Sequence, residues 1–228
     1  SDAVGLLKDS GVENIGLDLI YGIPGQTVPD WISELEKAVS LGIKHISAYA
    51  LTLEEGTLLF KAKNQLPQND DLTAEMWEAT DSFLSDYDFH RYEISNYSMP
   101  SYECAHNLDI WYGATYLGCG PAAASFDGEN RHSNPEDINL WPSPENILQD
   151  NISRELRARE ILSIGFRTAR GWDRKTFEKL AKEGNLADFE SRFKHIIDEK
   201  LIILSEDFVK LSNPGLLLWD SIAGEILQ

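Results

Sequence analysis

The chain has 228 residues, of which 42% are hydrophobic and 25% are charged, a composition typical of a folded globular protein. No run approaches the roughly 18 consecutive apolar residues of a membrane-spanning helix. Two cysteines are too few for a disulfide framework, so a reduced, cytoplasmic location is expected. The whole net charge of −18 lies in residues 1–150, because residues 151–228 carry 13 acidic and 13 basic side chains. An acidic half of this kind argues against nucleic acid or an anionic membrane as a partner.

The first 51 residues predict alternating helices and strands. A short helix is expected over 2–10, ended by Gly11 in the left-handed conformation. An apolar run predicts a buried strand over 14–20, and a Gly-Pro-Gly turn leads from it into a helix over 29–41. A second strand over 44–51 completes a strand–helix–strand unit, whose two strands end at the same edge of the sheet.

One carboxylate, Asp18, interrupts the first apolar run near its C-terminal end. Parallel α/β folds bind their ligands at that end, and an acid there commonly accepts hydrogen bonds from ribose hydroxyls. The alternative is a structural role, in which Asp18 caps a turn or pairs with a neighbouring cation. Gly22 and Gly25 are expected to serve the turn and a close backbone approach.

The rest of the chain predicts a small hairpin region and then a helical module. The elements expected before residue 150 are helices over 57–64 and 71–86 (N-cap Asp70), a strand over 90–95, an irregular stretch to Cys104, and a hairpin over 122–134 with a type I′ turn at Asp127-Gly128. Those expected after it are helices over 153–168, from Asp173 and over 186–199, a hairpin over 201–211, and a helix after Pro214. This order is typical of a winged-helix-like module. Its third helix is balanced in charge, which favours a structural or protein-contact role over DNA binding.

Several motifs together resemble one known family. Residues 17–27, Leu-Asp-Leu-Ile-Tyr-Gly-Ile-Pro-Gly-Gln-Thr, resemble a motif of the radical S-adenosylmethionine proteins, specifically the oxygen-independent coproporphyrinogen III oxidase family. The motifs that continue the match in order lie in 45–57, 92–97, 103–107 and 116–121. The resemblance is strong over residues 4–134 and loose over the helical tail. It implies an α/β fold, the C-terminal part of a partial (β/α)6 TIM-like barrel. Its expected division is 1–100 for the barrel part, 101–150 for the hairpin region and 151–228 for the winged-helix-like domain.

Two branches of this family differ in function. One decarboxylates coproporphyrinogen III oxidatively, and the other is a heme chaperone with an H-N-x-x-Y-W motif. His106, Asn107 and Trp111 match that motif, whereas Ile110 replaces its tyrosine. The resemblance therefore implies heme or a porphyrin as ligand and heme-accepting respiratory proteins as partners. The alternatives are a true anaerobic coproporphyrinogen III oxidase and a non-catalytic α/β interaction protein.

The family also implies two cofactors, S-adenosylmethionine and a [4Fe–4S] cluster. Asp18, Gly22, Thr52 and Ala124 are the positions that the resemblance implies for S-adenosylmethionine. The cluster needs three cysteines spaced C-x3-C-x2-C, whereas this chain has only Cys104 and Cys119, so no metal ligands are expected in it. The family pattern places the cluster motif before residue 1, and the chain alone is expected to be inactive in radical chemistry. A strand 14–20 left at a sheet edge would favour a homodimer.

Overall fold

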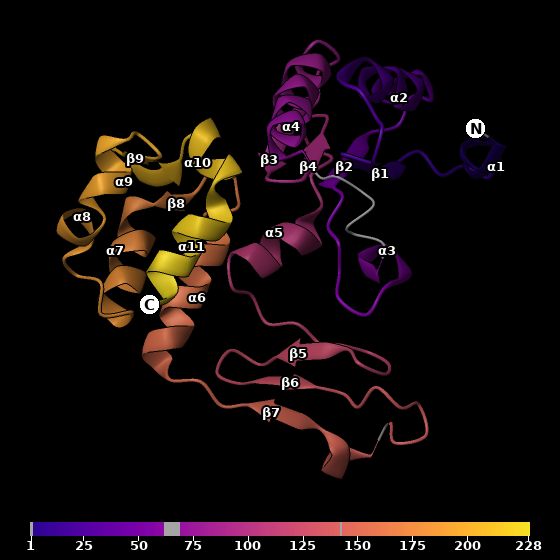
Figure 1. Ribbon diagram of the computed structural model, residues 1–228. Coiled ribbons are helices and arrows are strands. Elements are labelled where there is room, and N and C mark those ends of the chain that lie inside the picture. The colour runs from indigo at the N-terminus through magenta and orange to yellow at the C-terminus, as the bar shows by residue number, and fades with distance from the viewer. Residues whose placement is uncertain (1, 62–68, 142) are drawn as a thin grey trace. The chain divides into compact units, whose positions relative to one another are not determined.

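The computed structural model describes residues 2–61, 69–141 and 143–228 (Figure 1). The chain forms two compact units, Ser1–Glu103 and Cys104–Gln228. The fold is α/β, with mixed sheets and a helical C-terminal part, as the sequence predicts. Within these ranges no helix is both long and apolar enough to cross a membrane. A further boundary near residue 150 stays a prediction.

The first unit is a four-stranded sheet with helices. Its elements are α1 Asp2–Asp9, β1 Gly16–Tyr21, α2 Val28–Ser40, β2 His45–Ala50, α3 Leu58–Lys61, α4 Asp70–Ser85, β3 His90–Glu93 and β4 Asn96–Ser98. The strand order is β1-β2-β4-β3. β1 and β2 are parallel, with Gly16 opposite His45 and Tyr21 opposite Ala50, which confirms the strand–helix–strand unit. β4 is antiparallel to both of its neighbours.

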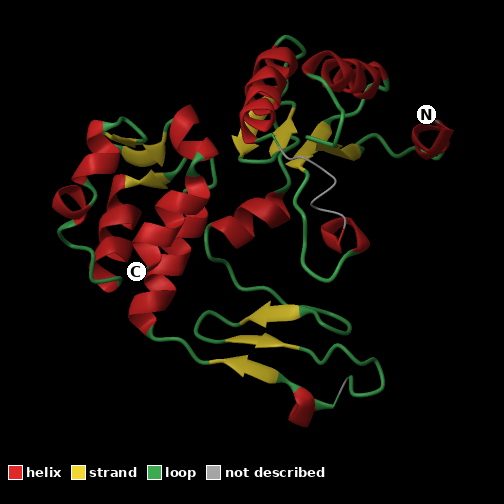
Figure 2. Ribbon diagram, viewed as in Figure 1, coloured by secondary structure: helices red, strands yellow, loops and turns green. Residues whose placement is uncertain are grey.

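Helix α2 begins and packs as its sequence predicts. Thr27 is its N-cap, and the side chains of Thr27 and Asp30 satisfy each other's backbone N–H groups in a capping box. Pro29 lies in the first turn, where its missing N–H is harmless. Trp31 and Leu35 are fully buried, and α2 packs beside α4 over the sheet (Figure 2). This packing fixes which face of β1 points away from the helices.

Two predictions for the first unit are wrong in detail, and a third extends beyond the described residues. The N-cap of α4 is Asn69 and not Asp70, because the Asn69 side chain accepts the Leu72 N–H at 3.1 Å. α3 is described only as far as Lys61, and the remainder of the helix predicted over 57–64 lies outside the described residues. The stretch expected to be irregular after residue 95 contains β4, whose three residues are all buried.

The second unit holds two three-stranded sheets and a set of helices. Its elements up to residue 165 are α5 Ala105–Trp111, β5 Ala124–Phe126, β6 Arg131–Ser133, the 3-10 helix Pro144–Asn146, β7 Leu148–Asp150 and α6 Arg154–Gly165. The later ones are β8 Trp172–Asp173, α7 Arg174–Glu183, α8 Phe189–Arg192, α9 Lys194–Asp198, β9 Ile202–Leu204, β10 Phe208–Leu211, α10 Asn213–Leu217 and α11 Trp219–Leu227. The sheet orders are β5-β6-β7 and β8-β10-β9.

The predicted hairpin over 122–134 is present as β5 and β6, but its turn differs. A type I′ turn needs positive φ at both central residues, and here Gly128 has φ +103° whereas Asp127 and Glu129 do not. Asp127 instead closes the turn with its carboxylate, which accepts the N–H groups of Glu129 at 2.8 Å and Asn130 at 2.7 Å. β7 adds a third strand that the sequence did not reveal.

The helical module also differs from its prediction in two places. The helix expected over 186–199 is broken into α8 and α9 at Phe193. The break lets Phe189 and Phe193 pack with ring centroids 4.5 Å apart, and Phe189 also meets Phe177 edge-on at 5.0 Å. The predicted hairpin over 201–211 gains β8 as a third strand, paired with β10.

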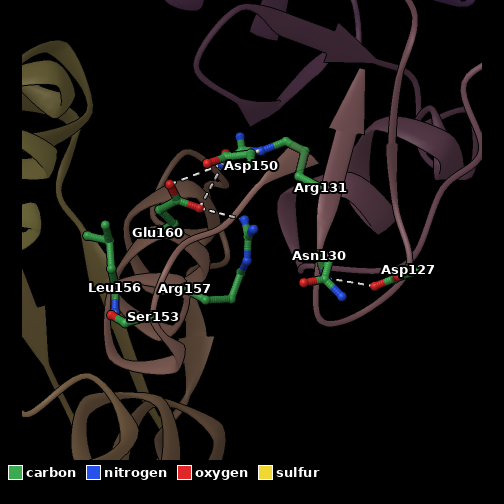
Figure 3. Close-up of polar contacts among 8 residues, drawn as sticks. All are labelled: Asp127, Asn130, Arg131, Asp150, Ser153, Leu156, Arg157 and Glu160. Atoms are coloured by element: carbon green, nitrogen blue, oxygen red, sulfur yellow. Dashed lines mark hydrogen bonds and ion pairs between the residues drawn. The ribbon is translucent and has the colours of Figure 1, made fainter. Parts of the chain in front are cut away.

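A chain of charged side chains joins the β5–β6–β7 sheet to α6 (Figure 3). Arg131 contacts Asp150 on β7 and Glu160 on α6, each at 3.1 Å. Arg157 contacts Glu160 at 2.6 Å and lies over the Phe126 ring at 4.8 Å. These contacts place Arg131, Phe126 and Asp150 on the face of the sheet that meets α6.

Candidate functional site

Asp18 lies in the middle of β1, on the face of the sheet that α2 does not cover. Successive side chains alternate along a strand, and Tyr21 contacts Trp31 of α2, so the even-numbered residues of β1 point the other way. Asp18 is exposed and stands opposite Ser47. The next pair toward the C-terminal edge is Ile20 and Tyr49, which are 50% and 43% exposed. This face therefore presents a carboxylate followed by two exposed, mostly apolar side chains, and the prediction that this strand is buried is wrong for this face.

The turn after β1 is closed by the side chain of Gln26, the residue that follows the Gly-Ile-Pro-Gly segment. Gly22 has φ +74°, which favours glycine, and Gln26 accepts the N–H groups of Gly22 at 2.9 Å and Ile23 at 3.3 Å with one oxygen. A Cβ at Gly22 would lie 3.3 Å from the Thr73 hydroxyl. The Gly22 amide is thus already engaged, and a direct contact between Gly22 and a cofactor stays a prediction.

Thr52 is exposed just beyond the end of β2. The Leu51 N–H donates to the Tyr21 carbonyl at 2.8 Å and extends the parallel ladder past the end of β1. Gly22 and Thr52 therefore follow two strands that end at one edge, with Asp18 on the uncovered face before it. Such an edge is where ligands bind in parallel α/β folds.

His45, on β2, contacts residues of both β1 and β3. Its Nε2 lies 2.7 Å from the Tyr92 hydroxyl, and a Cβ at Gly16 would come within 3.2 Å of its Nδ1. Burial lowers the pKa of His45, and the carboxylates of Asp18 and Glu93 partly oppose that change. The register of β1 and β2 brings Gly16 and His45 together, and that register cannot be known from the chain alone.

Glu93 is a buried carboxylate at the end of β3, which is separated from β2 by β4. It accepts the Ser95 N–H at 2.8 Å and is hydrogen-bonded by the Asn96 side chain. Asn96 is opposite Ser47 in the sheet. Asp18, His45, Glu93 and Asn96 therefore form a polar zone across the strands of the first unit.

The residues of the heme-type motif lie on α5 in the second unit, and α5 does not gather them on one face. His106 is exposed, whereas Asn107 and Trp111 are half-buried. At about 100° per residue, Trp111 is about 140° around the helix from His106 and about 40° from Asn107. Trp111 lies on Arg167, whose guanidinium is 4.7 Å from the ring centroids of Trp111 and Trp219.

Ala124 opens β5 beside a glycine that the packing requires. A Cβ at Gly118 would lie 2.1 Å from the Ala124 carbonyl oxygen, so a side chain at Gly118 would push the two segments apart. The Gly118 N–H donates to the Ser125 hydroxyl at 2.9 Å. The backbone segments at Gly118 and Ala124 therefore pack directly against each other. A contact between Ala124 and a cofactor stays a prediction.

The donor set of this chain does not fit a [4Fe–4S] cluster. Such a cluster is held by cysteine thiolates, and the two cysteines here, Cys104 and Cys119, are not joined in a disulfide and belong to no C-x3-C-x2-C motif. Over residues 2–61, 69–141 and 143–228, no group of three or more His, Cys, Asp or Glu side chains is placed to hold a metal ion. We therefore derive no chemistry from a cluster in this chain.

Comparison of the sequence with known proteins finds HemW heme chaperones and a radical S-adenosyl methionine domain-containing protein. No family model matches the chain. It is 27% identical to the heme chaperone HemW of Lactococcus lactis over 99% of its length and 62% of the relative, and 32% identical to HemW of Bacillus subtilis over 96% and 60%. A mitochondrial radical S-adenosyl methionine domain-containing protein 1 of Danio rerio is 29% identical over 93% and 52%. The chain thus spans about 60% of the length of the HemW proteins that it matches.

The fold has a match among solved structures. The coproporphyrinogen III oxidase HemN of Escherichia coli, a radical SAM enzyme, superposes with a TM-score of 0.77 at 16% identity, over 99% of this chain and 57% of that one. This likeness shows the fold alone and confirms the predicted partial barrel with a helical C-terminal part. Across nearly its whole length, the chain is homologous to the HemW heme chaperones and to radical S-adenosylmethionine domain proteins, as its motifs predict.

Proposed function

We propose that this chain is part of a heme chaperone that binds S-adenosylmethionine in its first unit and heme in its second. The observation that carries the proposal is the alignment with HemW proteins over 96–99% of the chain. The cluster ligands would come from a part of the protein that this chain does not include. We further propose a cytoplasmic location, heme-accepting respiratory proteins as recipients, and a homodimer paired through the edge strand β1.

In the proposed cofactor site, Asp18 accepts hydrogen bonds from the ribose hydroxyls of S-adenosylmethionine. Its exposed position on the uncovered face supports this role. Gly22 and Thr52 supply the backbone edge beside it. Ala124 belongs to the second unit, and its contact with the cofactor is proposed from the family resemblance alone. S-adenosylmethionine supplies the reactive methionine end when a cluster is present.

In the proposed heme site, the His106 imidazole ligates the iron. A neutral imidazole is a common iron ligand, and His106 is exposed on α5, where a large planar ligand can reach it. Asn107 is its neighbour on the helix. Trp111 contributes by fixing α5 through its stacking on Arg167.

The experiment that tests this proposal is calorimetric titration of S-adenosylmethionine into the cluster-loaded complete protein. Asp18→Asn should weaken binding about 10- to 100-fold, because a hydrogen bond to a charged group contributes about 1.5–3 kcal/mol. Asp9→Asn, an exposed aspartate on α1, is the matched control and should bind like the wild type. No heat of binding in the wild type would favour a non-catalytic interaction protein.

Anaerobic coproporphyrinogen III oxidation is the alternative function, favoured by the structural likeness to HemN. The two functions predict different results with the complete protein under anaerobic conditions. An oxidase turns coproporphyrinogen III over, whereas a chaperone binds heme without such turnover. Measurement of decarboxylated product against bound heme separates them.

A further inference from the structure

Strand β7, Leu148–Asp150, is the free edge of the β5–β6–β7 sheet in the second unit (Figure 1). The opposite edge is occupied, because Phe126 of β5 exchanges two backbone hydrogen bonds with Tyr116, of 2.8 and 2.9 Å. Among the described residues, no strand lies beyond β7. All three residues of β7 are exposed, so this edge is open to a further strand.

The register shows which way the backbone groups of β6 point. In an antiparallel pair of strands, opposite residues that exchange hydrogen bonds alternate with opposite residues that do not. Phe126 of β5 uses both its backbone groups on Tyr116, so it does not bond Arg131, the residue opposite it in β6. The bonded pair is Ser125 with His132. Arg131 therefore turns its N–H and C=O toward β7.

The same alternation shows what β7 presents at its outer edge. Leu148 and Asp150 form the bonded pairs with β6, and Gln149 lies between them. The N–H and C=O of Gln149 therefore point away from β6. Neither group has a hydrogen-bond partner in the part of the chain that the structure describes. An extended chain can pair with exposed edge groups of this kind.

Apolar side chains gather beside this edge. The exposed apolar side chains between β6 and the end of β7 are Ile138, Leu140, Trp141, Ile147 and Leu148. Trp141 and Ile147 line one hollow of about 690 Å³, together with Leu117, which is 83% exposed. Ile147 lies two residues before Gln149, so in an extended chain their side chains share one face. An apolar side chain that an added strand presents on this face would enter the hollow.

The charges around β7 are of one sign. Residues 132–150 contain Glu136, Asp137, Glu145 and Asp150 and no Lys or Arg. Glu136 and Glu145 are exposed, and no described residue bonds their carboxylates. Arg131, the cation just before this segment, is already paired with Asp150. This edge therefore repels a second copy of itself and attracts a strand of positive charge.

We infer that β7 binds an extended, basic segment of another protein, which adds a fourth strand to this sheet. The backbone of that segment bonds the outward N–H and C=O of Gln149. One of its apolar side chains enters the hollow beside Trp141 and Ile147, and its lysine or arginine side chains pair with Glu136 and Glu145. Neither heme nor S-adenosylmethionine takes part, so the inference is independent of the proposed function.

The first test is fluorescence anisotropy of the 228-residue chain with three labelled octapeptides, (Lys-Val)4, (Glu-Val)4 and (Lys-Pro)4. (Lys-Val)4 should bind about 10-fold or more tightly than (Glu-Val)4, because the edge is acidic. It should exceed (Lys-Pro)4 by a similar factor, because proline has no N–H to pair with a strand. Equal affinities for the two lysine peptides would show that charge alone attracts them and would overturn the inference. Equal affinities for (Lys-Val)4 and (Glu-Val)4 would also overturn it.

Gln149→Pro tests the edge itself, with Gln149→Ala as the matched control. The Gln149 N–H points outward, so proline removes a donor that the sheet does not use, and edge strands tolerate proline at such positions. Gln149→Pro should bind (Lys-Val)4 about 10-fold or more weakly, whereas Gln149→Ala should bind it like the wild type. Wild-type affinity in Gln149→Pro would contradict the inference.

Hydrogen exchange of the wild type gives a readout that no folding defect can imitate. The Gln149 amide should exchange freely in the unbound chain and should be protected when (Lys-Val)4 is bound. Exchange that the peptide leaves unchanged would overturn the inference.

The complete protein separates a foreign partner from the other possible occupants. It should bind (Lys-Val)4 as tightly as the 228-residue chain does. Loss of binding in the complete protein would show that another segment of the same protein covers β7, and a dimer that Gln149→Pro dissociates would show that a second copy does. Either result overturns the inference. Gln149→Pro should leave the titrations with S-adenosylmethionine and heme unchanged, so the proposed function can fail without affecting this result.

Discussion

The imidazole of His45 and the phenol of Tyr92 share a hydrogen bond of 2.7 Å across 47 residues of sequence. They lie on β2 and β3, which are separated in the sheet by β4. Gly16 of β1 makes room for the other side of the imidazole, since a Cβ there would come within 3.2 Å of Nδ1. This contact joins β2, the neighbour of the strand that carries Asp18, to β3 at the far edge of the sheet.

The stability of the chain should fall as the pH drops from 7.5 to 5.5, partly because of His45. Burial lowers the pKa of His45 in the folded state, so below about pH 6.5 the unfolded chain takes up this proton more readily. The free energy of unfolding therefore decreases with falling pH until the folded pKa is passed. Urea unfolding of the wild type and His45→Gln checks this, and the variant should show a flatter dependence.

His90→Gln provides the control for that measurement, because His90 is an exposed histidine in the same unit. Its pH dependence should match that of the wild type. Equal slopes in His45→Gln and the wild type would show that His45 is not the titrating group.

A buried hydrogen bond between α2 and α4 predicts a specific loss of stability. The Trp31 indole N–H donates to the Thr80 hydroxyl at 2.7 Å, and that hydroxyl donates to the Met76 carbonyl at 2.6 Å. Thr80→Val keeps the shape but leaves the indole N–H unpaired, which should lower the free energy of unfolding by about 1–3 kcal/mol. Thr80→Ser retains the hydroxyl and should lose less in the same denaturant titration.

Most elements could be predicted because their signals are local. The Gly11 stop, the Gly-Pro-Gly turn into α2 and the apolar run of β1 each depend on a few adjacent residues. β4 was not predicted because Asn96 and Ser98 are polar, and their burial depends in part on pairing with β2, which lies much earlier in the chain. The break between α8 and α9 at Phe193 was not predicted for a similar reason, since it accompanies ring packing between Phe193 and Phe189.

The candidate sites likewise contain residues that local sequence indicates and residues whose contacts depend on the folded structure. Asp18 was singled out as one polar residue in an apolar run; the structure shows it exposed on the uncovered face, and its role in binding stays a prediction. The partners of His45 depend on strand register, which the sequence does not reveal. The helical spacing in α5 could have shown in advance that His106 and Trp111 point in different directions.

Two helical glycines in the second unit should respond to alanine in opposite ways. A Cβ at Gly165, the last residue of α6, would lie 2.1 Å from the Trp172 ring, so Gly165→Ala must displace a buried tryptophan. Overpacking of this kind destabilises by about 1–3 kcal/mol. Gly224 in α11 has open space around it, so Gly224→Ala should stabilise by about 0.5–1 kcal/mol. Thermal unfolding of both variants checks the pair.

Alanine substitutions at His106 and Trp111 should have different effects on the free energy of unfolding. His106 is exposed, so His106→Ala should leave the free energy of unfolding within about 0.5 kcal/mol of the wild type. Trp111 is half-buried against Arg167, so Trp111→Ala should lower it by about 1–3 kcal/mol, less than the ~3–5 kcal/mol of a fully buried tryptophan.

The measurement is a pair of denaturant titrations with hydrogen exchange of the α5 amides. Exchange should accelerate in Trp111→Ala, because the stacking on Arg167 that holds α5 is lost, and should stay unchanged in His106→Ala. Trp111→Phe, which keeps a ring over the guanidinium, should give an intermediate result. An unchanged exchange rate in Trp111→Ala would show that α5 is held by other contacts and would remove the positioning role proposed for Trp111.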